Sequence, residues 1–326
     1  MKVMKYPAKE EWGKLVERPH LDVSQLNATV EGVLNDVKNN GDAAVKHYEE
    51  KFDHAHLSAL AVTEAEIEEA EGLISPELKH ALELAHHNIA TFHQSQKFEG
   101  EKVETAPGVT CWQKSVAIEK VGLYIPGGTA PLFSTVLMLA TPAKIAGCKE
   151  IVLCTPPNAE GKVNPAILMA AKIAGVSKIF KAGGVQAIGA MAYGTESVPK
   201  VYKIFGPGNQ YVMAAKQHVS LHDVAIDMPA GPSEVCVIAD ETSNPVFVAA
   251  DLLSQAEHGL DSQVFLISTS EDIIEKVQAE VARQLAVLPR LAMATKSLDN
   301  SKFVLVHDYD EAIQLSNTYA PEHLII

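Results

Sequence analysis

The stretch with the clearest potential for chemistry is Asp251–Gly259, in which an amide and an imidazole side chain lie three positions apart. If this stretch is helical, Gln255 and His258 project from the same face and together form half of a metal site. A zinc site normally has four ligands, and a catalytic one keeps a position for substrate or water. A histidine near a helix C-terminus also interacts favourably with the helix dipole, so both interpretations of this pair are open.

A second pair, Glu322 and His323, lies near the end of the sequence. An adjacent carboxylate and imidazole can divide proton transfers between them, with the histidine acting as the base near neutral pH. The dipeptide is common, so by itself it does not identify a site. The segment Asp227–Glu234 contains a serine without a G-x-S-x-G pattern, which argues against a hydrolase with a nucleophile elbow.

Three glycine-containing loops follow predicted strands and are candidates for binding a phosphate-bearing ligand. They are Tyr124–Pro131, Gly183–Gln186 and Gly206–Asn209. In an open parallel sheet, ligands bind beyond the C-terminal ends of the strands, where glycines let the backbone approach a phosphate and helix N-termini favour its charge. None of the loops has the G-x-G-x-x-G fingerprint, and a simple tight turn is the alternative for each loop taken singly.

The elements that position these loops alternate between strand and helix, which is typical of βαβ units with parallel sheets. The first series predicts strands over 121–125, 151–154, 179–182 and 201–205, with helices over 133–146, 165–174, 186–193 and 209–219. The second series predicts strands over 235–238, 264–267 and 303–306, a helix beginning at Pro245, and helices over 273–288 and 311–317. Residues 1 to about 115 are predicted to be mostly helical because their apolar residues recur at helical spacing.

The sequence therefore predicts an α/β protein with two parallel-sheet domains and an N-terminal helical segment. We assign 1–120 to the helical region, 121–234 to an inserted nucleotide-binding-like domain, and 235–326 to a second α/β domain that carries part of the metal site. The helices of 1–120 are expected to pack with 235–326, because the two ends of a domain often lie close together.

Composition narrows the class of protein. The net charge of -14 argues against a nucleic-acid-binding protein, which would show a basic face. The four cysteines lie far apart without a C-x-x-C pair, as expected for reduced thiols rather than a disulfide scaffold. There is no secretory signal at Met1 and no apolar run approaches the length of a membrane span. We expect a soluble, cytoplasmic protein that does not associate with membranes.

Taken together, five segments strongly resemble the histidinol dehydrogenase family, and the resemblance covers nearly the whole chain. It implies a zinc- and NAD-dependent, four-electron oxidation of L-histidinol to L-histidine through L-histidinaldehyde, in the final steps of histidine biosynthesis. It also implies a homodimer with shared active sites, built on Rossmann-like sheets loosely similar to those of aldehyde dehydrogenases. The segments are Gly122–Gly128, Lys203–Asn209, Asp227–Glu234, Ser254–Gly259 and Pro321–Leu324.

The resemblance implies roles for individual residues in binding the cofactor and the metal. Carried over by position, Gln255 and His258 correspond to zinc ligands. Tyr124, Gln186 and Asn209 correspond to contacts with NAD.

The same resemblance implies the substrate contacts and the catalytic pair. Ser233, Gln255 and His258 correspond to residues at the substrate. His323 corresponds to a substrate contact and to the general base for both hydride transfers, and Glu322 to the group that activates water for hydration of the aldehyde.

Members of the family continue beyond the position of Ile326, and the resemblance assigns to that part an Asp and a His at zinc and a Glu at the substrate. The chain is therefore expected to be C-terminally truncated and to hold zinc only weakly through Gln255 and His258. The alternative is a non-catalytic remnant that binds NAD or an imidazole ligand through the remaining loops.

Overall fold

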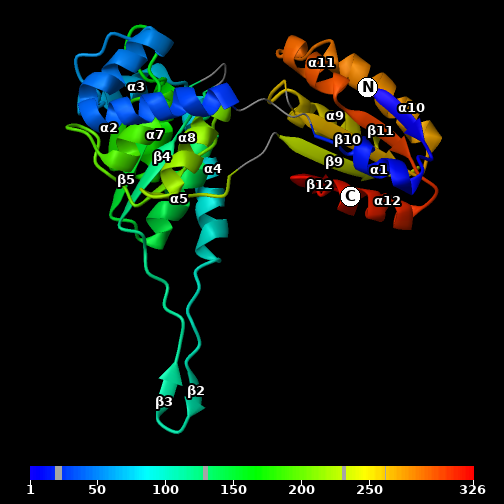
Figure 1. Ribbon diagram of the computed structural model, residues 1–326, viewed down its shortest axis with the longest axis horizontal. Helices are drawn as coiled ribbons and strands as arrows, with labels where there is room; N and C mark the ends of the chain where they lie inside the picture. Colours follow the sequence, from blue (N-terminus) through cyan, green and yellow to red (C-terminus); the bar gives the residue numbers. More distant parts are fainter. Residues whose placement is uncertain (19–23, 128–130, 230–232, 261) are drawn as a thin grey trace. The chain divides into compact units, whose positions relative to one another are not determined.

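The computed structural model describes residues 1–18, 24–127, 131–229, 233–260 and 262–326. The chain divides into two compact units (Figure 1). Unit 1 combines Met1–Leu21 with Gly231–Ile326, and unit 2 is Asp22–Ala230. Each unit is built around a parallel sheet, so the predicted α/β class is confirmed. No helix of the described ranges is both long enough and apolar enough to cross a membrane.

The sheet of unit 2 has the strand order β6-β5-β4-β7-β8, and every neighbouring pair is parallel. Its C-terminal edge therefore collects the loops that follow the strands. The strands are β4 (Lys120–Tyr124), β5 (Glu150–Thr155), β6 (Lys178–Lys181), β7 (Lys203–Phe205) and β8 (Ala225–Ile226). The helices are α2 (Ser24–Asp53), α3 (Glu64–Leu73), α4 (Pro76–Gln94), α5 (Phe133–Ala146), α6 (Pro165–Ala174), α7 (Gly184–Tyr193) and α8 (Gln210–Ser220).

The N-terminal helices belong to unit 2, and our expectation that they pack with residues 235–326 was wrong. Leu34 and Val37 of α2 share one core cluster with Ile188 of α7. Leu82 of α4 shares a second cluster with Leu137 of α5. Because the apolar stripes of α2 and α4 fit helices that flank the β4–β8 sheet, burial of these stripes decides where the helices pack. From the N-terminal region only residues 1–21 join unit 1.

Two departures from the predicted helical N-terminal region are local. Gly41 leaves helical geometry with φ 53° and ψ −132°, but the helix resumes at once and α2 continues to Asp53. Between α4 and β4, the chain forms an antiparallel hairpin of β2 (Val103–Ala106) and β3 (Val109–Cys111), which protrudes from unit 2 (Figure 1). Neither strand pairs with any other described strand.

The sheet of unit 1 has the order β1-β11-β10-β9-β12, again with parallel pairs. Its central strands β9 and β10 are buried along their whole length, as expected for strands covered on both faces. The strands are β1 (Lys2–Lys5), β9 (Glu234–Ala239), β10 (Gln263–Ser268), β11 (Lys302–Leu305) and β12 (His323–Ile325). The sequence did not predict β1.

Helices cover both faces of this sheet. One core cluster joins the sheet to α9 (Pro245–Ala256), α10 (Glu271–Leu285) and α11 (Leu291–Asp299), of which α11 was not predicted. The other cluster joins it to α1 (Trp12–Leu15) and α12 (Tyr309–Tyr319), and a short 3-10 helix, η1 (Lys9–Glu11), precedes α1.

Candidate active site

The candidate dinucleotide residues share the C-terminal edge of the unit 2 sheet. Tyr124 ends β4, Gln186 lies in the first turn of α7 after β6, and Asn209 is the N-cap of α8 after β7. The parallel strand order places these three ends on the same side of the sheet, where open α/β sheets bind ligands.

Tyr124 and Gln186 are buried and hold the loop between them. The backbone N–H of Gly184 donates to the Tyr124 hydroxyl at 3.1 Å. The Gln186 amide nitrogen donates to Glu49 Oε1 at 2.8 Å, and the Gln186 side chain is only 1% exposed. Burial raises the pKa of the Tyr124 phenol, so Tyr124 stays neutral and serves as a hydrogen-bonding group. Asn209 differs from both because it is exposed, and its side-chain oxygen caps α8.

Close packing explains the glycines of two loops. A Cβ added at Gly183 would lie 2.6 Å from Pro156 Cβ. Gly206 has φ 133°, and a Cβ there would lie 2.1 Å from the Tyr124 carbonyl oxygen. Both approaches are closer than real Cβ atoms allow, so a larger residue would force the loops apart. The tight-turn interpretation therefore applies at these two positions, whatever ligand the edge receives.

Backbone amides of these loops already have acceptors within the protein. Gly206 N–H donates to Asp227 Oδ2 at 2.9 Å, and Lys216, which is 1% exposed, contacts the other Asp227 oxygen and the Gly206 carbonyl. Gly183 N–H donates to Glu49 Oε1 at 2.7 Å. The loops are thus fixed in place by buried or half-buried acids, a feature that the sequence alone did not indicate.

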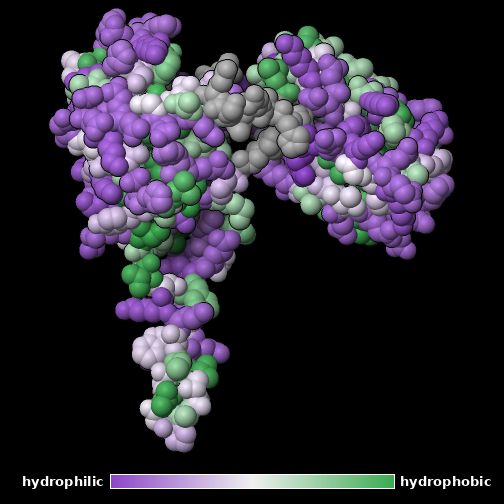
Figure 2. Space-filling model, in the orientation of Figure 1, coloured by the Kyte–Doolittle hydropathy of each residue, from purple (hydrophilic) through white to green (hydrophobic). Residues whose placement is uncertain are grey.

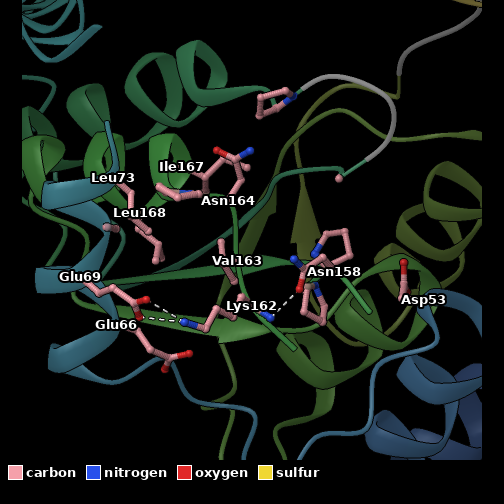
Figure 3. Close-up of a pocket in the computed structure, with 16 residues that line it drawn as sticks. Asp53, Glu66, Glu69, Leu73, Asn158, Lys162, Val163, Asn164, Ile167 and Leu168 are labelled. Carbon is pink, nitrogen blue, oxygen red and sulfur yellow. Dashed lines mark hydrogen bonds and ion pairs between the residues drawn. The ribbon is translucent and has the colours of Figure 1, made fainter. Parts of the chain in front are cut away.

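A cavity of about 560 Å³ adjoins this edge and lies wholly within unit 2 (Figure 3). Asp53 lies at one side, and Glu66 and Glu69 lie at the other; Gly127 of the loop after β4 also lines the cavity. Lys162 donates to Glu69 at 2.8 and 2.9 Å. With more carboxylates than ammonium groups, the cavity suits hydroxyl-rich ligand groups better than phosphates.

The candidate residues of unit 1 lie at the N-terminal edge of its sheet, where the strands begin. Ser233 directly precedes β9, and His323 begins β12 and pairs in register with Val235. Gln255 lies in the last turn of α9, the helix that returns the chain from the end of β9 to the start of β10. His258 lies beyond the helix end and is exposed. The predicted helix start at Pro245 is confirmed, but α9 ends at Ala256, before Gly259.

Glu322 and His323 are held at this edge in an open arrangement. His323 Nε2 lies 3.9 Å from Glu322 Oε1, and both side chains are about half exposed, at 53% and 46%. The other Glu322 oxygen accepts from the backbone N–H of Glu234 at 3.3 Å. The imidazole and the carboxylate can therefore each reach a ligand while the backbone of β9 orients the acid.

Arg18 organises the same edge from a distant part of the sequence. Its guanidinium makes a bidentate pair with Glu234, with distances of 2.5 and 2.9 Å. It also donates to the carbonyls of Tyr319 and Ala320 at 2.9 and 3.1 Å, directly before the Pro321-Glu322-His323 segment. Sequence reasoning missed Arg18, because no local pattern connects it with a carboxylate 216 residues away.

The donor set of the described residues fits zinc only in part. Gln255 and His258 supply an amide oxygen and an imidazole, and zinc normally takes four ligands. The described ranges contain no group of three or more His, Cys, Asp or Glu side chains placed to hold a metal ion.

Comparison with known proteins gave consistent matches. The family model of histidinol dehydrogenase matches residues 16–326. A histidinol dehydrogenase from Bacteroides thetaiotaomicron is 70% identical over 326 residues, which are 100% of this chain and 76% of that protein. One from Escherichia coli K12 is 52% identical over 320 residues, covering 97% of this chain and 73% of its own length. The crystal structure of histidinol dehydrogenase from Elizabethkingia anophelis matches with a TM-score of 0.96 and 52% identity, over 99% of this chain and 75% of that one.

Proposed function

The chain belongs to the histidinol dehydrogenase family of oxidoreductases, and we propose that it oxidises L-histidinol to L-histidine through L-histidinaldehyde with zinc and two NAD. The observation that carries this proposal is the 70% identity to a histidinol dehydrogenase over all 326 residues. The grouping of Ser233, Glu322 and His323 at one sheet edge supports it, because each has a role in the proposed reaction.

Glu322 and His323 divide the proton transfers in this proposal. His323 removes the proton of the carbinol as hydride leaves, and it serves again when the hydrated aldehyde is oxidised. Glu322 activates the water that hydrates the aldehyde. Both side chains are partly exposed and their nearest charged atoms are 3.9 Å apart, so they do not form a tight ion pair with each other. Each group can therefore contact the substrate, which supports this division. Ser233, which precedes β9, contacts the substrate at the same edge.

Zinc is proposed to bind Gln255 and His258, but these two donors do not form a complete site. The family resemblance assigns the other protein ligands, an Asp and a His, to sequence outside these 326 residues. The chain spans 76% of the length of its Bacteroides relative. When bound, zinc would orient the imidazole and amine of the substrate as a template.

NAD is proposed to bind at the C-terminal edge of the unit 2 sheet and to accept the hydrides. Asn209 is exposed at the N-terminus of α8 and can contact the cofactor directly. Tyr124 and Gln186 contribute mainly by holding the Gly183–Gly184 turn, since both are buried and bonded within the fold. The adjoining cavity has a volume typical of small-molecule sites and suits the nucleoside part, because its acidic lining favours hydroxyl groups over phosphates.

A second copy of the chain is proposed to cover the β2–β3 hairpin. An isolated two-stranded hairpin is marginally stable in water at best. Apolar side chains are exposed on this hairpin and directly after it, among them Val103, Val109 and Trp112, which are 54%, 51% and 57% exposed. Figure 2 shows hydrophobic (green) and intermediate (white) surface on the hairpin that protrudes from unit 2. A homodimer that buries the hairpin would remove this exposure and stabilise its two strands.

The proposed activity is tested by assaying NAD reduction with L-histidinol and added zinc, using the 326-residue chain. We expect turnover that depends on both zinc and histidinol and that is lost in His323→Asn. If the chain binds NAD or imidazole but shows no turnover at saturating zinc, the alternative of a non-catalytic remnant is correct.

A further inference from the structure

Two carboxyl groups lie beneath the turn that the proposed NAD site uses. Glu49 and Asp53 are four residues apart near the end of α2, so they share one side of the helix. Glu49 is 0% exposed. Its Oε1 accepts from Gly183 N–H at 2.7 Å and from the Gln186 side-chain amide at 2.8 Å. One oxygen of a buried acid therefore holds the start of the turn at Gly183 and the first turn of α7 at Gln186.

The second oxygen of Glu49 has a different environment. It is buried, and no N–H or O–H group of the described residues donates to it. The Asp53 carboxyl lies close enough for the two groups to shift each other's pKa, and its Oδ2 would lie 3.4 Å from a Cβ built at Gly183, the residue whose N–H donates to Glu49. Two carboxyl groups can hydrogen-bond to each other only when one of them carries a proton. A proton on Glu49 Oε2 would satisfy this oxygen and would also remove the repulsion between two adjacent anions.

The other ionisable groups around the pair do not supply a counter-charge to Glu49. Tyr124 from β4 and Cys154 from β5 face it, and burial raises the pKa of both, so both are neutral. His54, directly after α2, acts on Asp53 and lowers its pKa, whereas burial raises it. Lys181 at the end of β6 is already paired with Glu66. Burial raises the pKa of Glu49 to about 7.

We propose that Glu49 and Asp53 share a single proton, carried by Glu49 and donated to Asp53, and that this proton positions the Gly183–Gly184 turn and Gln186 for binding of the dinucleotide. This inference rests on the proposed function of the edge as an NAD site. Glu49 is a positioning residue, since it contacts the turn and not the ligand. Loss of the proton places two anions side by side under the turn, which drives Glu49 away from its two donors and adds negative charge beneath an anionic ligand.

The consequence is a pH dependence of NAD affinity with a defined sign. The protonated pair is the binding-competent form, and its population falls as the pH rises through about 7. If only this form binds, apparent affinity follows its fraction, so NAD binding is about tenfold weaker one pH unit above the pKa of Glu49 than one unit below it. Glu49→Gln removes this dependence, because glutamine keeps the acceptor for Gly183 and Gln186 and donates permanently to Asp53.

The test combines NAD titration calorimetry with infrared spectroscopy of the 326-residue chain. NAD affinity is measured at about pH 6 and about pH 8, on either side of the pKa of Glu49. The carbonyl band of a protonated carboxyl is recorded over the same range without NAD. Exposed Glu50, the next residue on α2, provides the matched control Glu50→Gln. We expect the wild type and the control to lose both the band and NAD affinity as the pH rises, and Glu49→Gln to lack the band and bind NAD equally at both pH values.

Three results would overturn the inference. One is a pH-dependent loss of NAD affinity in Glu49→Gln that equals the loss in the wild type. Another is the absence of a titrating carboxyl band in the wild type, a measurement that does not depend on whether the variant folds. The third is no NAD binding by any variant at any pH, which would refute the proposed NAD site itself, while the infrared band would still show whether the pair holds a proton.

Discussion

Replacement of Arg18 by alanine is the perturbation whose effect on unit 1 the structure defines most closely. The side chain of Glu234 is 6% exposed and that of Arg18 is 40% exposed. Exposed ion pairs contribute about 0.2–1 kcal/mol, whereas removing one partner of a buried pair costs about 3–5 kcal/mol. Because the acid is buried and the guanidinium is partly solvated, we expect Arg18→Ala to lower the free energy of unfolding of unit 1 by about 2–3 kcal/mol.

A double-mutant cycle identifies the physical origin of that loss. Glu234→Gln removes the buried charge and keeps an acceptor, so we expect it to cost less than about 1 kcal/mol. In Arg18→Ala/Glu234→Gln no buried charge is left unpaired, so the double variant should be more stable than Arg18→Ala alone.

Urea unfolding followed by tryptophan fluorescence can measure this cycle in unit 1 specifically. The chain has two tryptophans: Trp12 is 5% exposed in the core of unit 1, whereas Trp112 is exposed directly after β3 of unit 2. In a Trp112→Phe background, Trp12 reports unfolding of unit 1 alone. If the losses of the two single variants simply add in the double variant, the pair does not stabilise unit 1 by compensating the buried charge of Glu234, and our reasoning is wrong.

Three further outcomes are expected. Because two donors hold zinc weakly, metal analysis after dialysis without chelator should find no stoichiometric zinc, and EDTA should change the Tm little. About one tightly held zinc per chain would contradict this. His323→Asn should depress oxidation of both histidinol and histidinaldehyde by about 100- to 10,000-fold, whereas Glu322→Gln should impair aldehyde oxidation more than alcohol oxidation. Equal losses on both substrates in the Glu322 variant would refute the division of roles. Val109→Lys in the β2–β3 hairpin should shift the chain towards monomer in sedimentation experiments. The control Val287→Lys, at an 81% exposed site of unit 1, should not. A wild-type chain that sediments as a monomer at every concentration would rule out the proposed dimer.

The alternation of strand and helix was predictable because central parallel strands are continuous apolar runs and their helices have clear caps. Val264–Ile267, for example, lies within the buried strand β10. The edge strand β1 was not predictable, because the short sequence of Lys2–Lys5 has no buried residue and becomes a strand only by pairing with β11. The same holds for the hairpin, whose two strands contain no buried residue.

The packing of the N-terminal helices was beyond what periodicity can decide. The pattern over 24–53 indicates that α2 buries one face, but not which sheet provides the partner. Burial of that face of α2 against α7 determines that the helix packs in unit 2. A signal for Glu49 was nevertheless present, because it follows the buried Val45 by four positions and so places an acid on the buried face of α2.

The candidate residues could be named from the sequence, but the contacts that position their side chains could not. Glu322 and His323 were apparent from sequence, whereas Arg18 and Glu234 act on them through contacts between residues far apart in the chain. For Gln186, the sequence indicated the residue but not the direction of its side chain. Its position in a loop at a strand end favours a direct cofactor contact, yet the fold buries it and directs its amide to Glu49.

The stoichiometry of the reaction tests the central claim most directly. With added zinc and excess NAD, the quantities of NADH and L-histidine formed per L-histidinol consumed would be measured for the 326-residue chain. The proposed four-electron oxidation predicts two NADH and one histidine for each histidinol. Release of histidinaldehyde with a single NADH, or consumption of no histidinol at all, would contradict it.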